Sequence, residues 1–362
     1  MGDPRYEAYM GLGPNPIPHW EHWSCPDAET YLTGIDYYDH PRQCRLKLKE
    51  LYPQLGLAVP ETDESRARPR LDLEGESSDS EKHTVRWGDA ETATFKHGQA
   101  FSTADDVFAF SPLEHGDFSD MEVVERADFS SEEVVYERYR SRYPADAGER
   151  GPEGSAAGTG FYNTMFMWPL LTFGWELFLE TCLDPRFERI MDEFAEINRR
   201  VFRSFARLPI NFVVCHDDIV NTRGMVCSPA WMHKYVYPRY EEFWGILKAA
   251  GKEVIFMSDG NVNDVADDVM ACGARGIISE PYTDYKSIAR KYDNPFLAGE
   301  GDNRVLTRND PNEIRQMVES MVETSKMTGG YMMCIGNHIP WNVTPEGIKR
   351  YLDLSAELAV RS

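Results

Sequence analysis

Short apolar runs alternate with longer amphipathic runs from about residue 209 to residue 360. Such alternation is typical of parallel strands joined by crossover helices. Ser228, Asp310 and Thr344 each precede a proline, which marks three helix starts because the side chain can cap the helix and proline fits its first turn. The strands are predicted at 210–215, 253–257, 276–279, 295–298 and 330–334, and the helices at 228–249, 262–271, 284–291, 311–327 and 345–360. The pattern predicts an α/β fold, a (β/α)8 barrel.

The amino-terminal part is less regular but can supply the remaining barrel units. A strand near 18–23, a helix near 41–51 and the apolar segment 161–181 fit such units. Residues 61–160 contain acidic and Gly/Ser-rich stretches that are typical of solvated loops, and around Gly88-Asp89 the sequence alternates as in a β-hairpin. We interpret 61–160 as an insertion or cap within a single barrel domain that spans 1–362.

Composition excludes several classes of partner. With 362 residues, 42% of them apolar, the chain can bury a large core, and its net charge of −22 disfavours nucleic acid or anionic lipid, which require clustered Lys and Arg. Its seven cysteines lack disulfide-framework or CxxC spacing. The start lacks the features of a signal peptide, and no apolar run is long enough to span a bilayer. We expect a cytoplasmic protein with no membrane or nucleic-acid partner.

Polar clusters follow all five predicted strands, and each cluster contains an acid or a histidine. In a β/α barrel these loops carry the chemistry, since strand interiors are filled with packed side chains. The candidate catalytic residues are His216, Asp259, Glu280 and Glu300; the candidate metal ligands are His216, Asp259, Glu280 and Cys334; the candidate substrate contacts are Trp20, Phe161, Tyr162, Asn261, Tyr282 and His338. Imidazole and carboxylate ligands suit Zn²⁺, and a thiolate strengthens that preference.

Many of these polar residues also have a purely structural interpretation. Asp217 or Asp218 could cap the following turn, Cys334 could be a core residue and His338 could bind only backbone. The aromatic candidates could equally be packed core. The sequence leaves these alternatives open.

From about residue 161 to 360 the chain resembles the uroporphyrinogen decarboxylase superfamily of β/α barrels, and three segments carry this resemblance. They read HDDIVNTRGMVCSPAWMHKYVYPRYEEFWGILKAAGKEVIFMSDGN, GEGDNRVL and GGYMMCIGNHIPWNVTPEGI. The decarboxylases of this superfamily hold substrate carboxylates with an amino-terminal arginine-rich motif and use a Phe-Ser-Asp segment. Here NPIPHWEHWSCPDAETYLTG contains no arginine, and Phe118-Ser119-Asp120 lies in the insertion. These departures argue against a decarboxylase, since the carboxylates would lack cationic partners.

The other branch that the chain resembles comprises corrinoid-dependent methyltransferases. Members that use a thiol acceptor hold zinc with a His-x-Cys turn and a late Cys, whereas this chain has Met257 and Asp259 at the turn and keeps only Cys334. A hard oxygen in place of a soft ligand puts the thiol acceptor in doubt. The start PHWEHWSCPDAETYLTGIDYY is similar to the methyltransferases of anaerobic systems that split methyl ethers, including aromatic O-demethylases.

This resemblance implies that a methyl group moves from a methoxylated, aromatic compound to the Co(I) corrinoid of a separate corrinoid protein. The leaving oxygen must be protonated or bound to a Lewis acid, so either a metal such as Zn²⁺ or a protonated Glu280 or Glu300 is required. The alternatives are another corrinoid-dependent methyltransferase with a thiol acceptor or an amine donor, a decarboxylase-like lyase, and a non-catalytic barrel that binds a corrinoid or tetrapyrrole. For the oligomeric state of the protein, we consider a homodimer.

Overall fold

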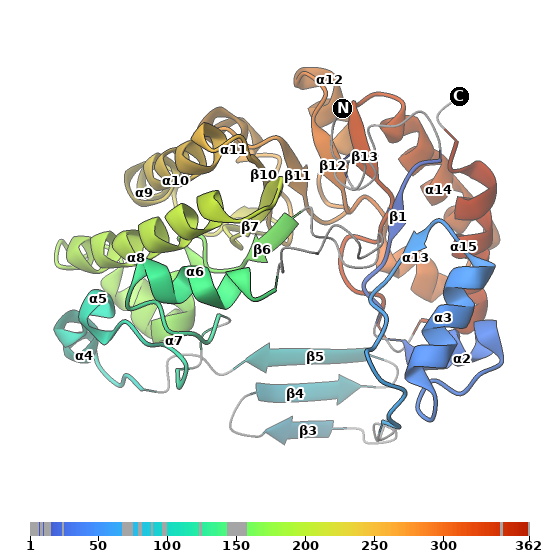
Figure 1. Cartoon of the computed structure of the whole chain (residues 1–362), viewed down its shortest axis with the longest axis horizontal. Helices are drawn as coiled ribbons and strands as arrows, with labels where there is room; N and C mark the ends of the chain where they lie inside the picture. The colour runs from blue at the N-terminus through green and yellow to red at the C-terminus, as the bar shows by residue number, and fades with distance from the viewer. Residues whose placement is uncertain are drawn as a thin grey trace.

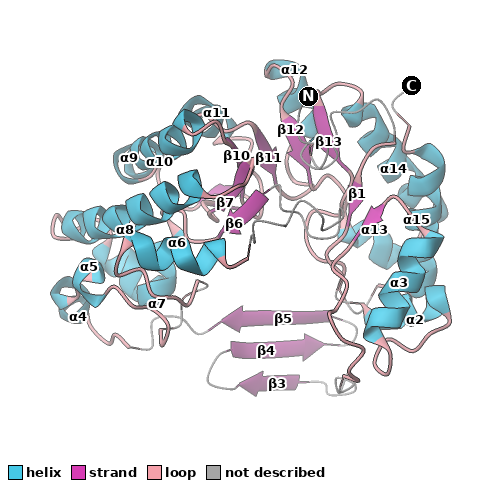
Figure 2. Cartoon of the chain, viewed as in Figure 1, coloured by secondary structure: helices cyan, strands magenta, loops and turns pink. Residues whose placement is uncertain are grey.

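A parallel sheet with helices packed along it forms the centre of the computed structural model (Figures 1 and 2). The structure describes residues 7, 10, 16–23, 25–66, 75–78, 82–87, 90–95, 100–121, 123, 125–142, 158–340 and 343–360. The sheet order is β13-β12-β11-β10-β7-β6. The strands are β6 (Gly158–Phe161), β7 (Phe212–His216), β10 (Glu253–Met257), β11 (Gly276–Ile278), β12 (Phe296–Ala298) and β13 (Gly330–Met332). All five strands predicted in this region are confirmed, each within two residues of its predicted bounds.

Two short amino-terminal strands extend this order. β1 (His19–Trp20) pairs in parallel with β2 (Leu55–Gly56), and a parallel bridge joins His19 to Met333, directly after β13. The combined order β6-β7-β10-β11-β12-β13-β1-β2 is that of a (β/α)8 barrel, in which consecutive strands are neighbours and the last returns to the first. β2 and β6 lie in separate sheets of the described structure, where residues 57–157 intervene. The α/β fold and its parallel order are confirmed, and closure of the barrel stays a prediction.

Helices follow the strands as the crossover rule requires. They are α2 (Pro26–Thr33), α3 (Pro41–Leu51), α7 (Met167–Thr181), α8 (Phe187–Arg207), α9 (Pro229–Tyr235), α10 (Tyr237–Ala249), α11 (Ala266–Cys272), α12 (Tyr285–Lys291), α13 (Asn303–Arg308), α14 (Pro311–Ser325) and α15 (Pro345–Leu358). The three predicted caps are confirmed: the side chains of Ser228, Asp310 and Thr344 accept hydrogen bonds from the first turns of α9, α14 and α15. The described helices are all too short or too polar to cross a membrane.

The helix predicted over 228–249 is two helices, α9 and α10, which meet at Val236. Pro238 causes the break, because its ring clashes with the carbonyl four residues earlier and it has no N–H to donate. Arg239 compensates: its Nη1 donates to the carbonyl of Tyr235 at 2.9 Å and to that of Lys234 at 3.4 Å.

The outer face of the sheet is packed with aromatic side chains from α8 and α10. Phe202 of α8 stacks on Phe243 of α10 with ring centroids 5.1 Å apart, and Phe161 of β6 packs edge-on against Phe202 and Phe205. All four rings are buried. Each contributes about 1.5–3 kcal/mol by burial, so this layer holds the helices firmly against the sheet.

Residues between β2 and β6 form a separate antiparallel sheet and three short helices. The elements are β3 (Gly75–Ser78), β4 (Lys82–Trp87), β5 (Ala90–Phe95), α4 (Ala104–Ala109), α5 (Pro112–His115) and α6 (Glu132–Arg140). Trp87 pairs with Ala90, so the predicted hairpin pairing is present, although Gly88 and Asp89 lie outside the described residues. The predicted insertion ended at 160, whereas β6 already belongs to the parallel sheet. A role as a cap stays a prediction.

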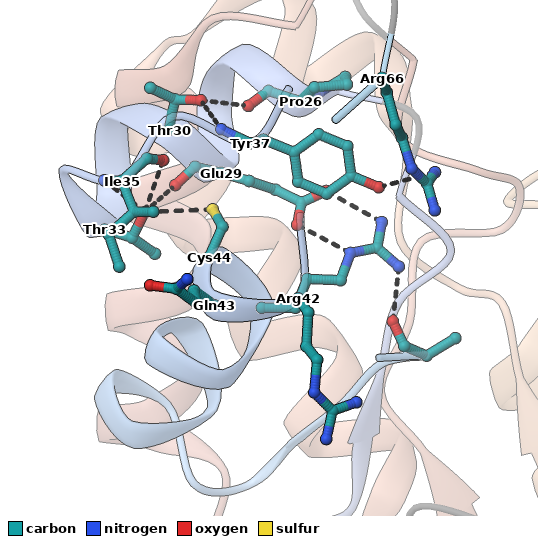
Figure 3. A network of polar contacts seen from close by, with 12 residues as sticks. Pro26, Glu29, Thr30, Thr33, Ile35, Tyr37, Arg42, Gln43, Cys44 and Arg66 are labelled. Carbon is teal, nitrogen blue, oxygen red and sulfur yellow. Dashed lines mark hydrogen bonds and ion pairs between the residues drawn. The ribbon is translucent and has the colours of Figure 1, made fainter. Parts of the chain in front are cut away.

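A buried ion pair fixes the amino-terminal helices α2 and α3 (Figure 3). The guanidinium of Arg45 donates to both oxygens of Glu29, at 2.9 and 3.0 Å, and also to the carbonyl of Ala58. Figure 3 shows Tyr37 beside Glu29, and the guanidinium of Arg66 donates to the Tyr37 hydroxyl at 3.2 Å. Because a bidentate Arg–carboxylate pair has a fixed geometry, it ties both helices to the chain that follows β2.

Candidate active site

A cavity of about 840 Å³ runs along the inner face of the parallel strands. Its size lies in the range of small-molecule sites, about 300–1,000 Å³. Side chains alternate along a strand, so Phe212, Val214 and His216 of β7 all face it. The lining residues are Trp20, His22, Gly158, Thr159, Gly160, Tyr162, Phe212, Val214, His216, Met257, Asp259, Ile278, Met332, Cys334, Ile335, Gly336, Asn337 and His338. The cavity therefore reaches the carboxyl ends of the strands, where the sequence predicted the site.

His216 and Asp259 line this cavity, and Asp218, which does not itself line it, converges with them. One ligand atom from each lies within 4.8 Å of the other two. Nε2 of His216 is 2.9 Å from Oδ1 of Asp218, and the backbone N–H of Asp259 donates to that same oxygen at 2.9 Å. The hydroxyl of Tyr162 lies 3.4 Å from the second oxygen of Asp218, and its ring packs against His216 with centroids 3.8 Å apart.

Burial and mutual repulsion shift the protonation of this cluster. Burial, reinforced by the charge of Asp218, raises the pKa of Asp259 to about 6. Burial raises the pKa of Glu280 as well, again with Asp218 adding to the effect. For His216, burial acts downward, but the hydrogen bond and charge of Asp218 outweigh it and raise the pKa of the imidazole. The cluster therefore favours a proton on His216 and can hold another on Asp259 near neutral pH.

Asn337 bridges two of the predicted catalytic acids. Its side-chain N–H group lies 3.3 Å from Oδ2 of Asp259 and 3.3 Å from Oε1 of Glu280. Asn337 lies in the loop after β13, and β12 and β11 separate that strand from β10 in the sheet. It therefore connects Glu280, which does not itself line the cavity, to the cluster on its wall.

The structure distinguishes between the adjacent acids Asp217 and Asp218. Asp217 is fully buried, points away from the cavity and accepts hydrogen bonds at 2.6–2.8 Å from the N–H groups of Met165, Phe166 and Met167 and from the hydroxyl of Tyr240. It anchors the start of α7, a structural role. Asp218 points to the opposite side and joins His216. The sequence had left both acids as possible caps of the turn that follows them; Asp217 instead caps the start of α7, which precedes it in the chain, and Asp218 lies against His216.

Part of the cavity lining is aromatic, with Trp20, His22 and His338 close together. Trp20 is 41% exposed, and its ring lies 6.0 Å from that of His22, which in turn meets His338 edge-on at 5.8 Å. Burial lowers the pKa of both histidines, so both are neutral near pH 7. Three predicted substrate contacts, Trp20, Tyr162 and His338, thus line the cavity, and His22, which lines it too, was not predicted.

Cys334 lines the cavity but lies outside the cluster of His216, Asp218 and Asp259. Burial, with the charge of Glu21 adding to it, raises the pKa of its thiol. Glu21 itself accepts hydrogen bonds from the backbone N–H of Ile335 and from the hydroxyl of Tyr351. Behind Cys334, then, a buried carboxylate holds the loop that carries Asn337 and His338.

Besides Glu280, four predicted site residues do not line the cavity. Phe161 belongs to the aromatic layer outside the sheet, because it is one residue out of phase with Tyr162. Asn261 caps a turn by accepting from the N–H of Asn263, and Tyr282 packs under the guanidinium of Arg304 at 4.5 Å. Glu300 faces α14 and accepts hydrogen bonds from Ser320, Thr324 and Tyr331 at 2.8–3.1 Å.

Glu300 is turned outward by the residue before it. Strand alternation would continue inward from Phe296 and Ala298 to Glu300, but Gly299 has φ +99°, a conformation that L side chains rarely adopt. The backbone rotates there, and the side chain of Glu300 moves to the helix side of the sheet. Sequence alternation could not reveal this rotation, although a glycine directly after a strand is its one visible signal.

Comparisons with known proteins bear mainly on the carboxyl-terminal half. Residues 183–358 match the family model described as Uroporphyrinogen decarboxylase (URO-D). No curated protein matches the sequence. Among solved structures, the chain is similar to a xylose isomerase-like TIM barrel protein from Mycobacterium smegmatis in complex with magnesium, at 11% identity over 68% of this chain and 96% of that chain. The TM-score of 0.29 is too low to support an argument. Residues 183–358, just under half of the chain, are therefore similar to the uroporphyrinogen decarboxylase family.

Proposed function

We propose that this chain is a methyltransferase that moves a methyl group from a methoxylated, aromatic compound to the Co(I) corrinoid of a partner corrinoid protein. The observation that carries the proposal is the cluster of His216, Asp218 and Asp259, of which His216 and Asp259 line the same cavity as Trp20 and His338. The match to an enzyme family of this superfamily is compatible with it.

The reaction requires help at the leaving oxygen. The methyl carbon–oxygen bond breaks, the electron pair of Co(I) forms the new carbon–cobalt bond, and the oxygen leaves with the bonding electrons and takes up a proton. An alkoxide or phenoxide leaves slowly unless it is protonated or bound to a Lewis acid. Asp259, with a pKa of about 6, and His216 beside it can hold the required proton at the cavity wall.

The cavity also suits the ring of the proposed substrate. Trp20, Tyr162 and His338 present aromatic faces or edges, which pack on aromatic rings in offset or edge-to-face arrangements. The residues that line the cavity include no Lys and no Arg in the part of the chain that the structure describes. A polycarboxylate tetrapyrrole would therefore lack cationic partners, which disfavours the decarboxylase alternative.

A methylated amine is the second candidate donor. Asp218 and Asp259 place negative charge near Tyr162, whose ring lines the cavity, and aromatic rings with nearby carboxylates bind quaternary ammonium groups. The two donors differ in what they need, because an ammonium leaves as a neutral amine without a proton donor. An amine donor would thus make the protonated form of Asp259 unnecessary.

The proposal is tested by incubating the purified protein with reduced cobalamin and a panel of methoxybenzoates, with methylated amines as a second panel. We expect methylcobalamin and the matching hydroxybenzoate to form in equal amounts. Hydroxybenzoates and methylbenzoates, which lack the ether, serve as matched controls that yield none. Failure of every ether would refute the proposal, and methyl transfer from the amines alone would establish the second candidate.

A further inference from the structure

The cavity extends along β6 and β7 from its polar end toward the amino ends of these strands, where its lining is apolar. Phe212 is the first residue of β7 and His216 is the last, and both line the cavity. At about 3.3 Å per residue, the four steps between them correspond to about 13 Å along the strand. We call this extension the apolar shaft, and the residues of β6 and β7 that line it are Gly158, Gly160, Phe212 and Val214.

Side chains on the inner face of the sheet are less buried here than those on the outer face. Val213, Cys215 and Ile277, which face the helices, are all 0% exposed, whereas Val214 and Ile278 are only partly buried. In a β/α barrel the inner face is normally filled by packed side chains. An apolar surface thus stays open beside the cavity, and an apolar ligand that covered it would remove it from water.

Two glycines of β6 provide the space for the apolar shaft. Gly158 and Gly160 are in register with Phe212 and Val214 of β7 and line the cavity with them. The ring of Phe212 occupies the place where a Cβ atom of Gly158 would be. At Gly160, in contrast, a Cβ atom would meet no atom of the described chain within 4 Å. The space beside Val214 therefore remains free for a ligand.

We propose that the apolar shaft binds an extended apolar substituent of the methyl donor, so that the preferred substrate is a methoxylated ring with an alkyl chain para to its methoxy group. This inference rests on the proposed function and names its substrate class. A cavity of about 150 Å³ is large enough for one benzene ring. The present cavity has about 840 Å³, so a single methoxylated ring at its polar end would leave the apolar shaft empty.

The two ends of the cavity determine the orientation of such a substrate. Asp259 lies at the carboxyl end, where Trp20 is 41% exposed and the cavity is open to solvent. Phe212 lies at the other end, in a buried hydrophobic cluster with Ile255 and Phe296. An ether oxygen beside Asp259 directs a para chain toward Phe212. The methyl group then stays near the open end, which a partner protein can approach.

Binding to the apolar shaft is measured with 4-alkylphenols, whose chains run from methyl to pentyl. These compounds are the products expected from the corresponding methyl ethers and have no methyl group to transfer. Calorimetric titration of the full chain gives their Kd values. We expect the affinity to rise about fourfold with each added methylene group, the usual effect of burying one. The kcat/KM of the matching methyl ethers should rise in parallel.

Gly160→Leu fills the apolar shaft with a side chain of the protein. We expect 4-methylphenol to bind as it does to the unaltered chain, whereas the gain with each methylene group is lost. Gly245→Leu is the matched control, because a Cβ atom on this exposed glycine of α10 meets no atom within 4 Å, and it should keep the full gain. Val214→Phe reaches the same space from β7 and provides a second blocking variant. Circular dichroism and urea unfolding verify that each variant is folded.

An affinity that does not change with chain length in the unaltered protein would overturn the inference. A gain that persists in the folded blocking variants would overturn it as well. Binding and methyl transfer are measured separately. Methyl transfer at a rate independent of chain length would defeat the apolar shaft alone, whereas the expected gain in phenol binding without methyl transfer from any ether would defeat the proposed function alone.

Discussion

Asp259 and Glu300 occupy equivalent positions after two strands of the sheet but face opposite sides of it. Each follows the last residue of its strand, β10 or β12, by two residues. Asp259 continues the inward alternation and lines the cavity, where it lies close to His216 and Asp218. Glu300 faces α14 and is surrounded by hydroxyl donors. An acid that follows a strand therefore lies at the carboxyl edge of the sheet. The backbone conformation determines whether its side chain faces the cavity or the helices.

The surroundings of Asp259 and Glu300 also affect the protonation of the two carboxyl groups in different ways. Both have a raised pKa, and burial is the main cause for each. For Asp259 the next contribution is the repulsion of Asp218, whereas the neighbours of Glu300 are hydroxyl groups that favour its charged form. The first arrangement holds a proton beside a cavity, and the second joins a strand to a helix. The following variants test this difference.

Asp259→Asn should have the largest effect. The amide keeps the shape of the carboxyl group but can neither transfer a proton nor act as a strong oxygen ligand. We expect methylcobalamin formation to slow by about 10²–10⁴-fold, the usual contribution of a positioned acid. Stopped-flow absorbance of the cobalamin gives the rate, with unfolding by urea as the check on stability. A rate within about threefold of the unaltered chain would contradict the assigned role of Asp259, since it corresponds to less than about 0.7 kcal/mol.

Gly299→Ala should produce the next largest change, in stability. A methyl group at this position, with φ +99°, would collide with the carbonyl of Ser279 and lie 2.9 Å from the hydroxyl of Tyr285. We expect the free energy of unfolding to fall by about 3 kcal/mol, from backbone strain and crowding together. Gly245→Ala is the control, because a methyl group there meets no atom within 4 Å. Equal stabilities of the two variants in urea would show that the turn at Gly299 is not constrained as described.

Glu300→Ala should destabilise the protein by about 1–3 kcal/mol, because it leaves the buried hydroxyl of Tyr331 without its carboxylate partner. The rate of methyl transfer by the folded protein should remain unchanged. Urea unfolding and the cobalamin assay, performed on the same sample, separate the two effects. A loss of methyl-transfer rate with unaltered stability would show that Glu300 takes part in the reaction. It would contradict the structural role that distinguishes Glu300 from Asp259.

Glu300→Gln should have the smallest effect, visible as a change in pH dependence. Because the pKa of Glu300 is raised above 4.5 in the folded protein, the folded state binds more protons than the unfolded state between 4.5 and the folded pKa. The stability contributed by this group is therefore highest below that window and declines as the pH rises through it. Urea midpoints measured from about pH 4.5 to about pH 7 should decline less in the variant. Parallel curves would contradict a raised pKa.

The sequence predicted the parallel strands well because their signal is local. Each strand is a short run of apolar residues between turn residues, and proline after a capping side chain marked the starts of α9, α14 and α15. Helix α8 was overlooked although its buried residues recur at helical spacing. Contact between β2 and β6 depends on residues about 100 positions apart in the chain, and no local pattern determines it.

The candidate site was predictable only where alternation held. His216, Asp259 and Cys334 line the cavity as expected, since each keeps the inward phase of its strand. Phe161 is out of that phase, and Gly299 interrupts it before Glu300. Asp217 and Asp218 are adjacent and identical in type, so only the three N–H donors at the entry to α7, those of Met165, Phe166 and Met167, show which one is structural. The role of Asn337 could not be predicted, because its contact with Asp259 joins two loops that are far apart in the sequence.

The most direct test follows the methyl group itself. A methoxybenzoate carrying a ¹³C-labelled methyl group is incubated with the protein and reduced cobalamin, and the products are examined by NMR. The account predicts that the label appears on cobalt, with one equivalent of hydroxybenzoate released, and that Asp259→Asn slows this transfer by about 10²–10⁴-fold while Glu300→Gln does not. Label that stays on oxygen in the presence of the unaltered protein, for every ether in the panel, would contradict it.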